Sequence, residues 1–352
     1  MKVENTSKST KNRYIDDEFL AKIQKLDDSL YEHFSDKFVV DKNITRKLVS
    51  FQANKTHTHY RWYKYKEAFS ADLVEYLFSK YDVNKGKILD PFSGVGTALF
   101  AGYDLGYDAE GIEILPLGQK IIEANIIARS HHKKNIVVRL DYWLSKAVWN
   151  KKGETKDFEV LRITESAYPK ETEHKIKRYL YEIEHELQEA KEILLFALLC
   201  VLEPISYTRK DGQYLRWDYR ANRKNGKNTF NIGKILSFDE AITSKLKEIL
   251  DDISVGQNNF DLFTSTKKDF EHGKVKILKG SCLNLLPTIK RETYTGIITS
   301  PPYCNRYDYT RTYALEHALL GVKENELVSL RQAMLSCTVE SKKKDILSFN
   351  QE

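Results

Sequence analysis

The chain has 352 residues, of which 41% are hydrophobic and 30% are charged, so it can bury a core and is not disordered overall. Its net charge of +6 is too modest by itself to indicate a nucleic-acid partner. No apolar run is long enough to span a membrane, and the polar N-terminus MKVENTSKSTKNR has no apolar signal core. We therefore expect about two domains and a cytoplasmic protein without a membrane partner.

Cysteine and histidine spacing excludes some kinds of site. The four cysteines Cys200, Cys282, Cys304 and Cys337 lie far apart and form no CxxC pair, which is typical of reduced thiols in a cytoplasm. The nine histidines have no accompanying Cys/His zinc spacing, so we expect no metal site.

Two helices are predicted before the first strand. Residues 1–13 are polar and are expected to fray. Residues 14–48 carry apolar residues at helical spacing and are predicted to be helical. Residues 68–81 form the next predicted helix, with Ser70 as its N-cap.

The stretch KILDPFSGVGTALFAGYDLGYDAEGIEILP has the pattern of half a doubly wound α/β unit. Ile88 and Leu89 indicate a short strand, and residues 97–105 indicate a helix. A second strand is expected to end near Glu113, and a helix over 116–129 follows a proline. The order strand, glycine turn, helix and strand predicts a parallel sheet.

A long interruption of this pattern follows. Residues 131–170 are mixed, residues 171–202 are predicted to form one long amphipathic helix, and residues 238–254 another. About 140 residues, 131–272, therefore separate the second and third strands. A connection of that length with its own helices is expected to be an inserted functional module.

A basic and aromatic segment lies inside this module. From Tyr207 to Lys234 there are eight basic and only two acidic residues, an excess equal to the net charge of the whole chain. Aromatic residues and glycines alternate with the basic groups, a combination that suits phosphate contact and base stacking. The alternative is a solvated basic loop on an ordinary surface.

The α/β pattern resumes with a strand over 275–280 and another over 296–300. Ile297 and Ile298 are expected to be the last buried positions of that strand. The two prolines of ITSPPYCNRYDY cannot donate to a sheet ladder, so the strand should end at about Ser300. The hydroxyl, the prolyl carbonyls and the following tyrosine ring are then displayed where open α/β sheets bind ligands.

The glycine turn DPFSGVGT is the second chemical motif. Gly94 and Gly96 allow the backbone to approach a ligand, and the motif is neither a P-loop nor GxGxxG. Glu113 lies 17 residues past Gly96, at the tip of the next strand, where an acid can accept both hydroxyls of a ribose. Together they favour a nucleoside-containing cofactor. The alternative for Glu113 is a surface carboxylate at a strand end.

These motifs resemble those of a known family. DPFSGVGT followed by EGIEI resembles motifs I and II of S-adenosylmethionine-dependent DNA amino-methyltransferases, and TSPPY resembles motif IV of their N4-cytosine branch. RWYKYKEAFSADLVEYL (61–77) is similar to their motif X, and KGSCLNLL (279–286) stands where motif III follows the third strand. The resemblance covers about 60–130 and 275–320.

The resemblance implies a set of site residues. Phe69 and Ser70 would touch the methionine part of S-adenosylmethionine. The turn would be lined by Asp90, Phe92, Gly94 and Gly96, and Glu113 would bind the ribose. Ser281 and Cys282 stand where many relatives have an acidic residue near the adenine, a departure that leaves the adenine contact open. The catalytic pocket would consist of Ser300, Pro301, Pro302 and Tyr303.

The expected reaction is methyl transfer to the exocyclic N4 of a cytosine that is flipped out of double-stranded DNA. Ser300 and the Pro301 carbonyl can accept the N–H groups, and Tyr303 can stack on the base. Arg306 and Asp308 either position the substrate or hold the loop together. C5 methylation needs a thiolate, normally from a Pro-Cys pair, but Tyr303 stands between Pro302 and Cys304, and a packing role is favoured for Cys304.

The resemblance also implies an organisation. The fold is expected to be α/β, a Rossmann-like methyltransferase sheet with helices on both faces and a large, mostly helical insertion between strands 2 and 3. An N-terminal helical extension (1–60) precedes a cofactor-binding part (61–130), the inserted target-recognition region (131–272) and the catalytic part (273–352). The candidate DNA contacts are Arg209, Lys210, Arg216, Arg220, Arg223 and Lys224.

No strand is predicted after TSPPY, only helices over 314–320 and about 324–336. The predicted sheet is therefore incomplete at its C-terminal side, and an unpaired strand would expose an edge. A second polypeptide, a homodimer or a truncated product would each account for this, with an exposed apolar surface near Ile297, Leu315 and Leu319. Two further alternatives are an N6-adenine or RNA methyltransferase and a non-catalytic nucleic-acid-binding subunit.

Overall fold

The computed structural model describes residues 17–37, 40–211, 215–221, 230–255, 272–303 and 307–335. The chain forms two compact units, Met1–Thr45 and Arg46–Glu352. In the first unit, helix α1 (Asp17–Phe34) is followed by a short 3-10 helix, Ser35–Lys37. The predicted helix over 14–48 is therefore too long, because turns occupy the chain from Lys42 onward. None of the described helices is both long and apolar enough to cross a membrane.

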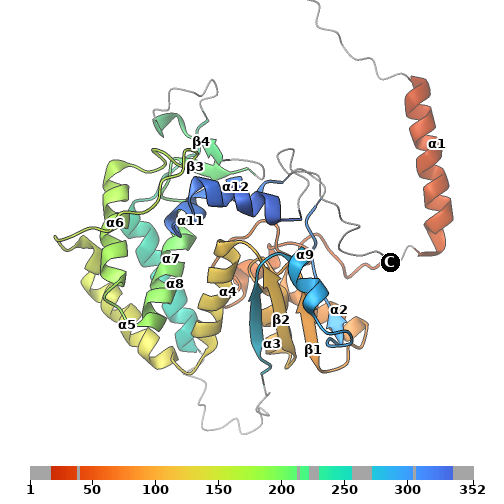
Figure 1. Ribbon diagram of the computed structural model, residues 1–352, viewed down its shortest axis with the longest axis horizontal. Coiled ribbons are helices and arrows are strands. Elements are labelled where there is room, and N and C mark those ends of the chain that lie inside the picture. Colours follow the sequence, from red (N-terminus) through yellow and green to blue (C-terminus); the bar gives the residue numbers. More distant parts are fainter. Residues whose placement is uncertain are drawn as a thin grey trace, which may run out of the picture. The chain divides into compact units, whose positions relative to one another are not determined.

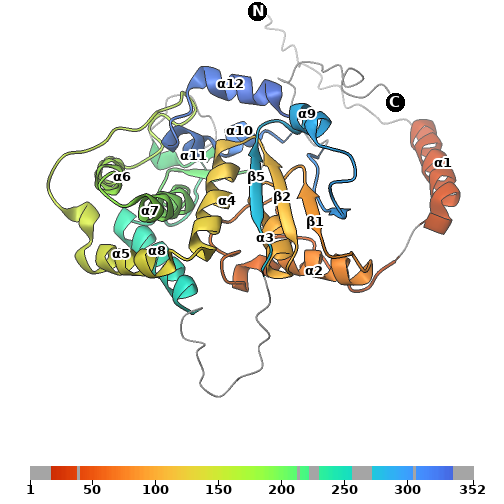
Figure 2. The same cartoon turned by 60° about the horizontal axis from the view of Figure 1, so that its bottom comes forward.

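A parallel four-stranded sheet organises the second unit. Its strands are β1 (Lys87–Asp90), β2 (Asp108–Glu113), β5 (Val275–Lys279) and β6 (Gly296–Ile297). The spatial order is β5-β2-β1-β6, and Figure 2 shows β5, β2 and β1 side by side. Chain order therefore runs outward from β1 through β2 to β5 and then switches to the other side of β1. Ligands bind at such a switch point, outside the carboxyl ends of the strands.

Strand alternation gives the sheet two apolar faces. Ile88 packs with residues of α2 (Ala71–Lys80) and α3 (Thr97–Asp104), whereas its neighbour Leu89 packs with Ile112 and Cys282. The predicted helices over 68–81 and 97–105 and the predicted strands that end near Asp90 and Glu113 are confirmed with small changes at their ends. Ser70 caps α2 as predicted, since its hydroxyl accepts from the Leu73 amide at 3.1 Å.

Helices fill the connection between β2 and β5. They are α4 (Pro116–Arg129), α5 (Lys133–Lys146), α6 (Lys170–Ile183), α7 (Gln188–Val201) and α8 (Phe238–Val255), gathered beside the sheet in Figure 1. Strands β3 (Thr208–Lys210) and β4 (Leu215–Trp217) pair antiparallel in the basic segment, for which the sequence analysis predicted no strand. Short 3-10 helices occupy Ala53–Thr56, Val148–Asn150, Tyr219–Ala221 and Leu286–Thr288.

The single helix predicted over 171–202 is wrong. The chain leaves helical geometry after Glu184 and α7 begins at Gln188, so that α6 and α7 are separate helices. The break lets both helices turn an apolar stripe toward one core. The Tyr179 hydroxyl, for example, donates to the Leu194 carbonyl at 2.9 Å across the two helices.

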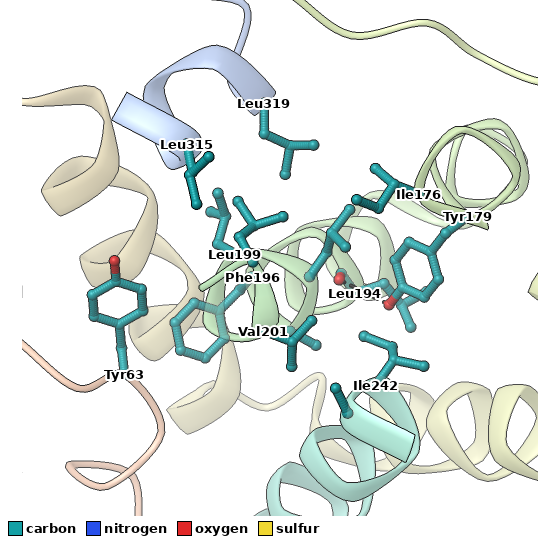
Figure 3. Packing of buried hydrophobic residues seen from close by; sticks show 14 of the residues in the cluster. Tyr63, Ile176, Tyr179, Leu194, Phe196, Leu199, Val201, Ile242, Leu315 and Leu319 are labelled. Atoms are coloured by element: carbon teal, nitrogen blue, oxygen red, sulfur yellow. Dashed lines mark hydrogen bonds between the residues drawn. The ribbon is translucent and has the colours of Figure 1, made fainter. Parts of the chain in front are cut away.

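The largest core of the molecule lies around α7. Figure 3 shows Ile176 and Tyr179 of α6, Leu194 and Leu199 of α7 and Ile242 of α8 in one cluster with Leu315 and Leu319. The last two belong to α11 (Ala314–Leu319), which follows α10 (Tyr309–Thr312) and precedes α12 (Glu324–Ala333). The predicted helices after TSPPY are confirmed. The expected exposure of Leu315 and Leu319 is wrong, because α11 packs them against α7.

Strand β6 also differs from its prediction. It has only two residues, and Ile298 adds one more ladder bond by donating to the Leu89 carbonyl at 3.1 Å. Ile297 is 65% exposed rather than buried, because β6 is the outer strand on this side of the described sheet. The expected apolar surface is thus confirmed at Ile297 alone.

A substitution in the α7 core tests this packing. Leu194→Ala should lower the free energy of unfolding by about 2–5 kcal/mol, because it removes buried methyl groups and leaves a cavity. The control Leu187→Ala truncates the same side chain type on the surface, where Leu187 is 63% exposed, and should change stability by less than about 0.5 kcal/mol. Urea unfolding curves measure both free energies. Equal losses of stability in the two variants would contradict the placement of α7 at the centre of the core.

Candidate functional site

A cleft opens at the carboxyl ends of the strands, with an empty volume of about 820 Å³ that includes its open mouth. Nine of the thirteen predicted cofactor and catalytic residues line it: Phe69, Phe92, Gly94, Glu113, Ser281, Cys282, Ser300, Pro302 and Tyr303. The glycine turn follows β1 and the TSPPY corner follows β6, and these strands are neighbours. Both corners therefore face one cleft, as the sequence predicts.

The glycine turn is held by Asp90. Its carboxylate accepts from the Phe92 amide at 3.0 Å and from the Thr299 hydroxyl at 2.7 Å, which links the turn to the segment before Ser300. Burial raises the pKa of Asp90 to about 6, against the effect of these two hydrogen bonds. Gly94 and Gly96 both have positive φ, +53° and +82°, a backbone conformation that side chains with a Cβ disfavour.

Glu113 lies at the tip of β2 and is buried. Its Oε1 accepts from the Leu115 amide at 2.6 Å, and burial raises the pKa of Glu113 from 4.5 to about 7. Gly118 explains how α4 comes so close: a Cβ there would lie 2.4 Å from the Gly94 carbonyl oxygen and 2.7 Å from Glu113 Cγ. The glycine thus allows the first turn of α4 to pack on both cleft residues.

The TSPPY corner presents Ser300 and Tyr303 to the cleft. Their hydroxyl oxygens are 2.8 Å apart, in a hydrogen bond in which either can be the donor. Tyr303 is 49% exposed, so part of its side chain is open to an incoming group.

Four predicted site residues do not line the cleft. They are Ser70, Asp90, Gly96 and Pro301. Ser70 is fully buried, and its hydroxyl donates to the Leu48 carbonyl while it caps α2. Gly96 is the N-cap of α3, where a Cβ would meet Ile122 at 2.9 Å. Ser70, Asp90 and Gly96 thus hold the backbone around the cleft, whereas Pro301 is exposed.

Asp308 holds the loop after TSPPY together. It caps α10 by accepting from the Thr310 and Arg311 amides at 3.0 and 3.2 Å, and it forms an ion pair with Arg331 at 3.1 Å. These contacts favour the loop-holding alternative over substrate contact. The other candidates of this loop, Cys304 and Arg306, lie outside the described residues.

The basic segment divides its cations between interior and surface. Lys210 is only 7% exposed, and its ammonium group contacts Glu316 and lies 3.2 Å from the Tyr63 hydroxyl. Its charged group is therefore turned inward and paired within the protein. Arg209 donates to the Glu203 carbonyl at 2.8 Å, Arg220 pairs with Asp218 at 2.6 Å, and Arg216 pairs with Asp211 at 2.5 Å. Arg223 and Lys224 lie outside the described residues.

Sequence reasoning missed several residues that line the cleft, among them Tyr65, Glu67, Thr97, Tyr309, Met334 and Leu335. Tyr65 and Glu67 precede Phe69 directly in YKEAF, and Tyr309 follows TSPPY in RYDYT. For these three residues, closeness in sequence to a recognised motif was the signal that could have identified them as lining residues. Met334 and Leu335 had none, because they are brought to the cleft by the path of the chain after α12.

The chain is similar to curated methyltransferases. It is 51% identical over 339 residues to the type II methyltransferase M.AvaI of Nostoc sp. (strain PCC 7120), a match that covers 96% of this chain and 69% of that protein. It is 39% identical over 323 residues to the type II methyltransferase M.BsoBI of Geobacillus stearothermophilus, which covers 86% of this chain and 60% of that protein. No family model and no solved structure matches the chain.

The fold and the site define an α/β protein with a ligand cleft at its topological switch point. The similarity shows the family: this chain belongs to the type II methyltransferases, the DNA methyltransferases of restriction–modification systems.

The raised pKa of Glu113 predicts a pH dependence of stability. A carboxyl group whose pKa rises on folding stabilises the folded state at every pH below its pKa in the unfolded chain. For Glu113 this stabilisation is lost as the pH rises from 4.5 to about 7. At pH 8 the free energy of unfolding of Glu113→Gln should therefore exceed that of the unmodified chain by up to roughly 3 kcal/mol. At pH 4 the two free energies should be equal.

Urea unfolding at several pH values measures this difference. The exposed Glu171 serves as the control, since Glu171→Gln should follow the unmodified chain throughout. Parallel stability curves for Glu113→Gln and the unmodified chain would contradict the assignment of a buried, protonatable carboxyl group.

Proposed function

We propose that this protein transfers a methyl group from S-adenosylmethionine to the exocyclic N4 of a cytosine flipped out of double-stranded DNA. The observation that carries the proposal is the meeting of the glycine turn, Glu113 and the TSPPY corner in one cleft. Family membership supports DNA methylation, and the TSPPY sequence supports the N4-cytosine branch.

The cleft residues fit the cofactor. S-adenosylmethionine supplies an electrophilic methyl group on a sulfonium. The carboxylate of Glu113, at the tip of β2, suits the two ribose hydroxyls, and Phe92 and Cys282 provide apolar walls for a nucleoside. The Ser281 hydroxyl donates to the Ala333 carbonyl at 2.8 Å, so its hydrogen is already engaged. In an adenine contact the Ser281 oxygen can then act only as an acceptor, through its two lone pairs.

Ser300 and the Pro301 carbonyl are the proposed acceptors for the two amine hydrogens. The amine of cytosine is a poor nucleophile, because its lone pair is delocalised into the ring. Two acceptors favour a tetrahedral nitrogen whose lone pair points at the methyl group. When Tyr303 donates to Ser300, the serine oxygen keeps a lone pair for the amine. The exposed ring of Tyr303 offers a stacking surface for the flipped base.

The DNA contacts are proposed for the hairpin β3–β4 and its flanks. Arg216 is the clearest described candidate: its side chain is 44% exposed, and its guanidinium lies 5.3 Å from the centre of the Phe230 ring. Arg209 and Arg220 remain candidates for DNA contact. For the buried Lys210 we propose a structural role instead. The proposed boundaries at residues 60, 130 and 272 place this hairpin in the target-recognition region.

Nucleoside analysis of DNA incubated with labelled cofactor tests the reaction. We expect N4-methylcytosine, and we expect Ser300→Ala and Tyr303→Ala to lower turnover by at least tenfold while cofactor binding persists. The exposed controls Ser329→Ala and Tyr81→Ala should retain activity. Detection of N6-methyladenine instead would favour the alternative of an adenine methyltransferase. Absence of any methylated product would favour a non-catalytic subunit. Normal turnover of Ser300→Ala and Tyr303→Ala would overturn the pocket assignment.

DNA titrations at several salt concentrations test the hairpin. Arg216→Ala should weaken binding and reduce the salt slope by about one, because one phosphate contact is lost. Arg291→Ala removes an exposed arginine before β6, at the opposite ends of the strands, and should leave binding unchanged.

Lys210→Met should instead lower the free energy of unfolding by about 3–5 kcal/mol, because Glu316 loses its buried cation. If Lys210→Met is instead as stable as the unmodified chain but binds DNA poorly, Lys210 is a DNA contact and the structural role is wrong.

A further inference from the structure

Helix α1 leaves an apolar face open to solvent. Four of its apolar side chains form one stripe along the helix, which we call the α1 stripe: Phe19, Ile23, Leu26 and Leu30. Each of the four is between 48% and 59% exposed. A helix with a polar side and an apolar side gains most of its stability by packing the apolar side against a partner. The α1 stripe therefore has the character of an interaction surface.

The spacing of the α1 stripe is that of a coiled coil. Its intervals of four, three and four residues place Phe19 and Leu26 at heptad position d, and Ile23 and Leu30 at position a. The outward positions b, c and f from residue 18 onward are held by residues that are polar or small, except for one tyrosine: Glu18, Ala21, Gln24, Lys25, Asp28, Tyr31 and Glu32. Isoleucine at a, followed by leucine at d, favours two parallel strands.

The charge of α1 narrows the kind of partner. The sequence of the helix contains five acidic residues and two lysines, which gives it a net charge of −3 with His33 neutral. Helices that bind anionic lipid or nucleic acid through charge are rich in lysine and arginine instead. A helix with this charge is repelled by both, so the α1 stripe fits the surface of a protein.

A second copy of α1 offers the matching surface. In a parallel pair of helices, position g of one helix faces position e of the other, five residues further along. Lys22 is at position g and Asp27 at position e, so a parallel pair places a lysine beside an aspartate twice, once on each side of the seam. An antiparallel pair brings e to e and g to g, and would separate Lys22 from Asp27. The charges therefore favour the parallel arrangement.

We propose that α1 forms a parallel two-stranded coiled coil with α1 of a second copy of this chain, with the α1 stripe as its seam and Lys22 paired with Asp27 across it. This inference is independent of the proposed function. A two-fold symmetric contact uses the same patch on both copies, which is the commonest way in which identical chains associate. Because His33 stands at the next d position, the apolar seam ends at Leu30. So short a seam gives an association that depends on protein concentration.

Sedimentation equilibrium of the full chain over a range of concentrations tests this inference. The unmodified chain should show a monomer–dimer equilibrium. Leu26→Asp should raise the dissociation constant at least hundredfold, because it places an unpaired charge in the middle of the apolar seam. Ala21→Asp is the matched control: it adds the same charge at the outward position f, where the side chain is exposed, and should dimerise like the unmodified chain. Thermal unfolding of each variant shows whether the unit Arg46–Glu352 is folded.

Two charge reversals test the parallel pairing itself. Lys22→Glu and Asp27→Lys each turn two attractions across the seam into two repulsions, so either variant alone should dimerise roughly tenfold more weakly. An equimolar mixture of the two variants should associate as tightly as the unmodified chain, because each variant then meets the opposite charge on its partner. The advantage of the mixture over the separate variants should fall as salt is added.

The pattern across the variants decides between outcomes. Recovery of association in the mixture of Lys22→Glu with Asp27→Lys supports the proposal, since only a parallel pair of α1 helices predicts it. An unmodified chain that stays monomeric at every concentration would overturn the proposal, and so would a dimer that survives Leu26→Asp. A dimer that is lost in Leu26→Asp but is insensitive to both charge reversals would overturn the parallel pairing. Protection of α1 from proteolysis in a strictly monomeric protein would also overturn it, because the same chain would then cover the α1 stripe.

Discussion

The hydrogen bond from Thr299 to Asp90, 2.7 Å long, joins the tips of β6 and β1. It is the contact on which the cleft depends, because the two halves of the site come from segments about 200 residues apart in the chain. Parallel pairing of β1 with β6 brings the strand tips together, and the Asp90 carboxylate then fixes the glycine turn through Phe92 and the TSPPY segment through Thr299. A residue that does not itself line the cleft thus links both motifs.

Local sequence rules predicted those parts of the fold in which local signals and packing agree. The helix over 116–129 has a proline at its start and Arg129 at its end, and α4 has the predicted bounds. The strand ends at Asp90 and Glu113 were also predicted, since polar residues follow short buried runs. The break between α6 and α7 was not, because Glu184 to Leu187 contains no glycine or proline and helical propensity continues through it. Only the shared core, where Tyr179 meets Leu194, requires the turn.

The site was predictable in its motifs and not in its charges. Counting basic residues in 207–234 treats every cation as exposed, but Lys210 faces inward and meets Glu316. Alternation along β3 is the reason: Arg209 points to one side of the hairpin and Lys210 to the other, and the second side is covered by α11. Glu67 shows the converse. It lies within the stretch 61–77 but was not singled out there, because only the fold brings the Tyr313 hydroxyl of a distant segment to its carboxylate.

Helix α11 connects these observations. Glu316, in its second position after Ala314, binds Lys210 of the hairpin, while Tyr313, immediately before the helix, binds Glu67 in the cleft. Leu315 and Leu319 anchor the same helix against α7. Because buried, close-packed groups move together or not at all, the hairpin and the wall of the cleft share one rigid support. The proposed target-recognition hairpin and the Glu67 wall of the cleft are therefore both supported by the segment that contains α11.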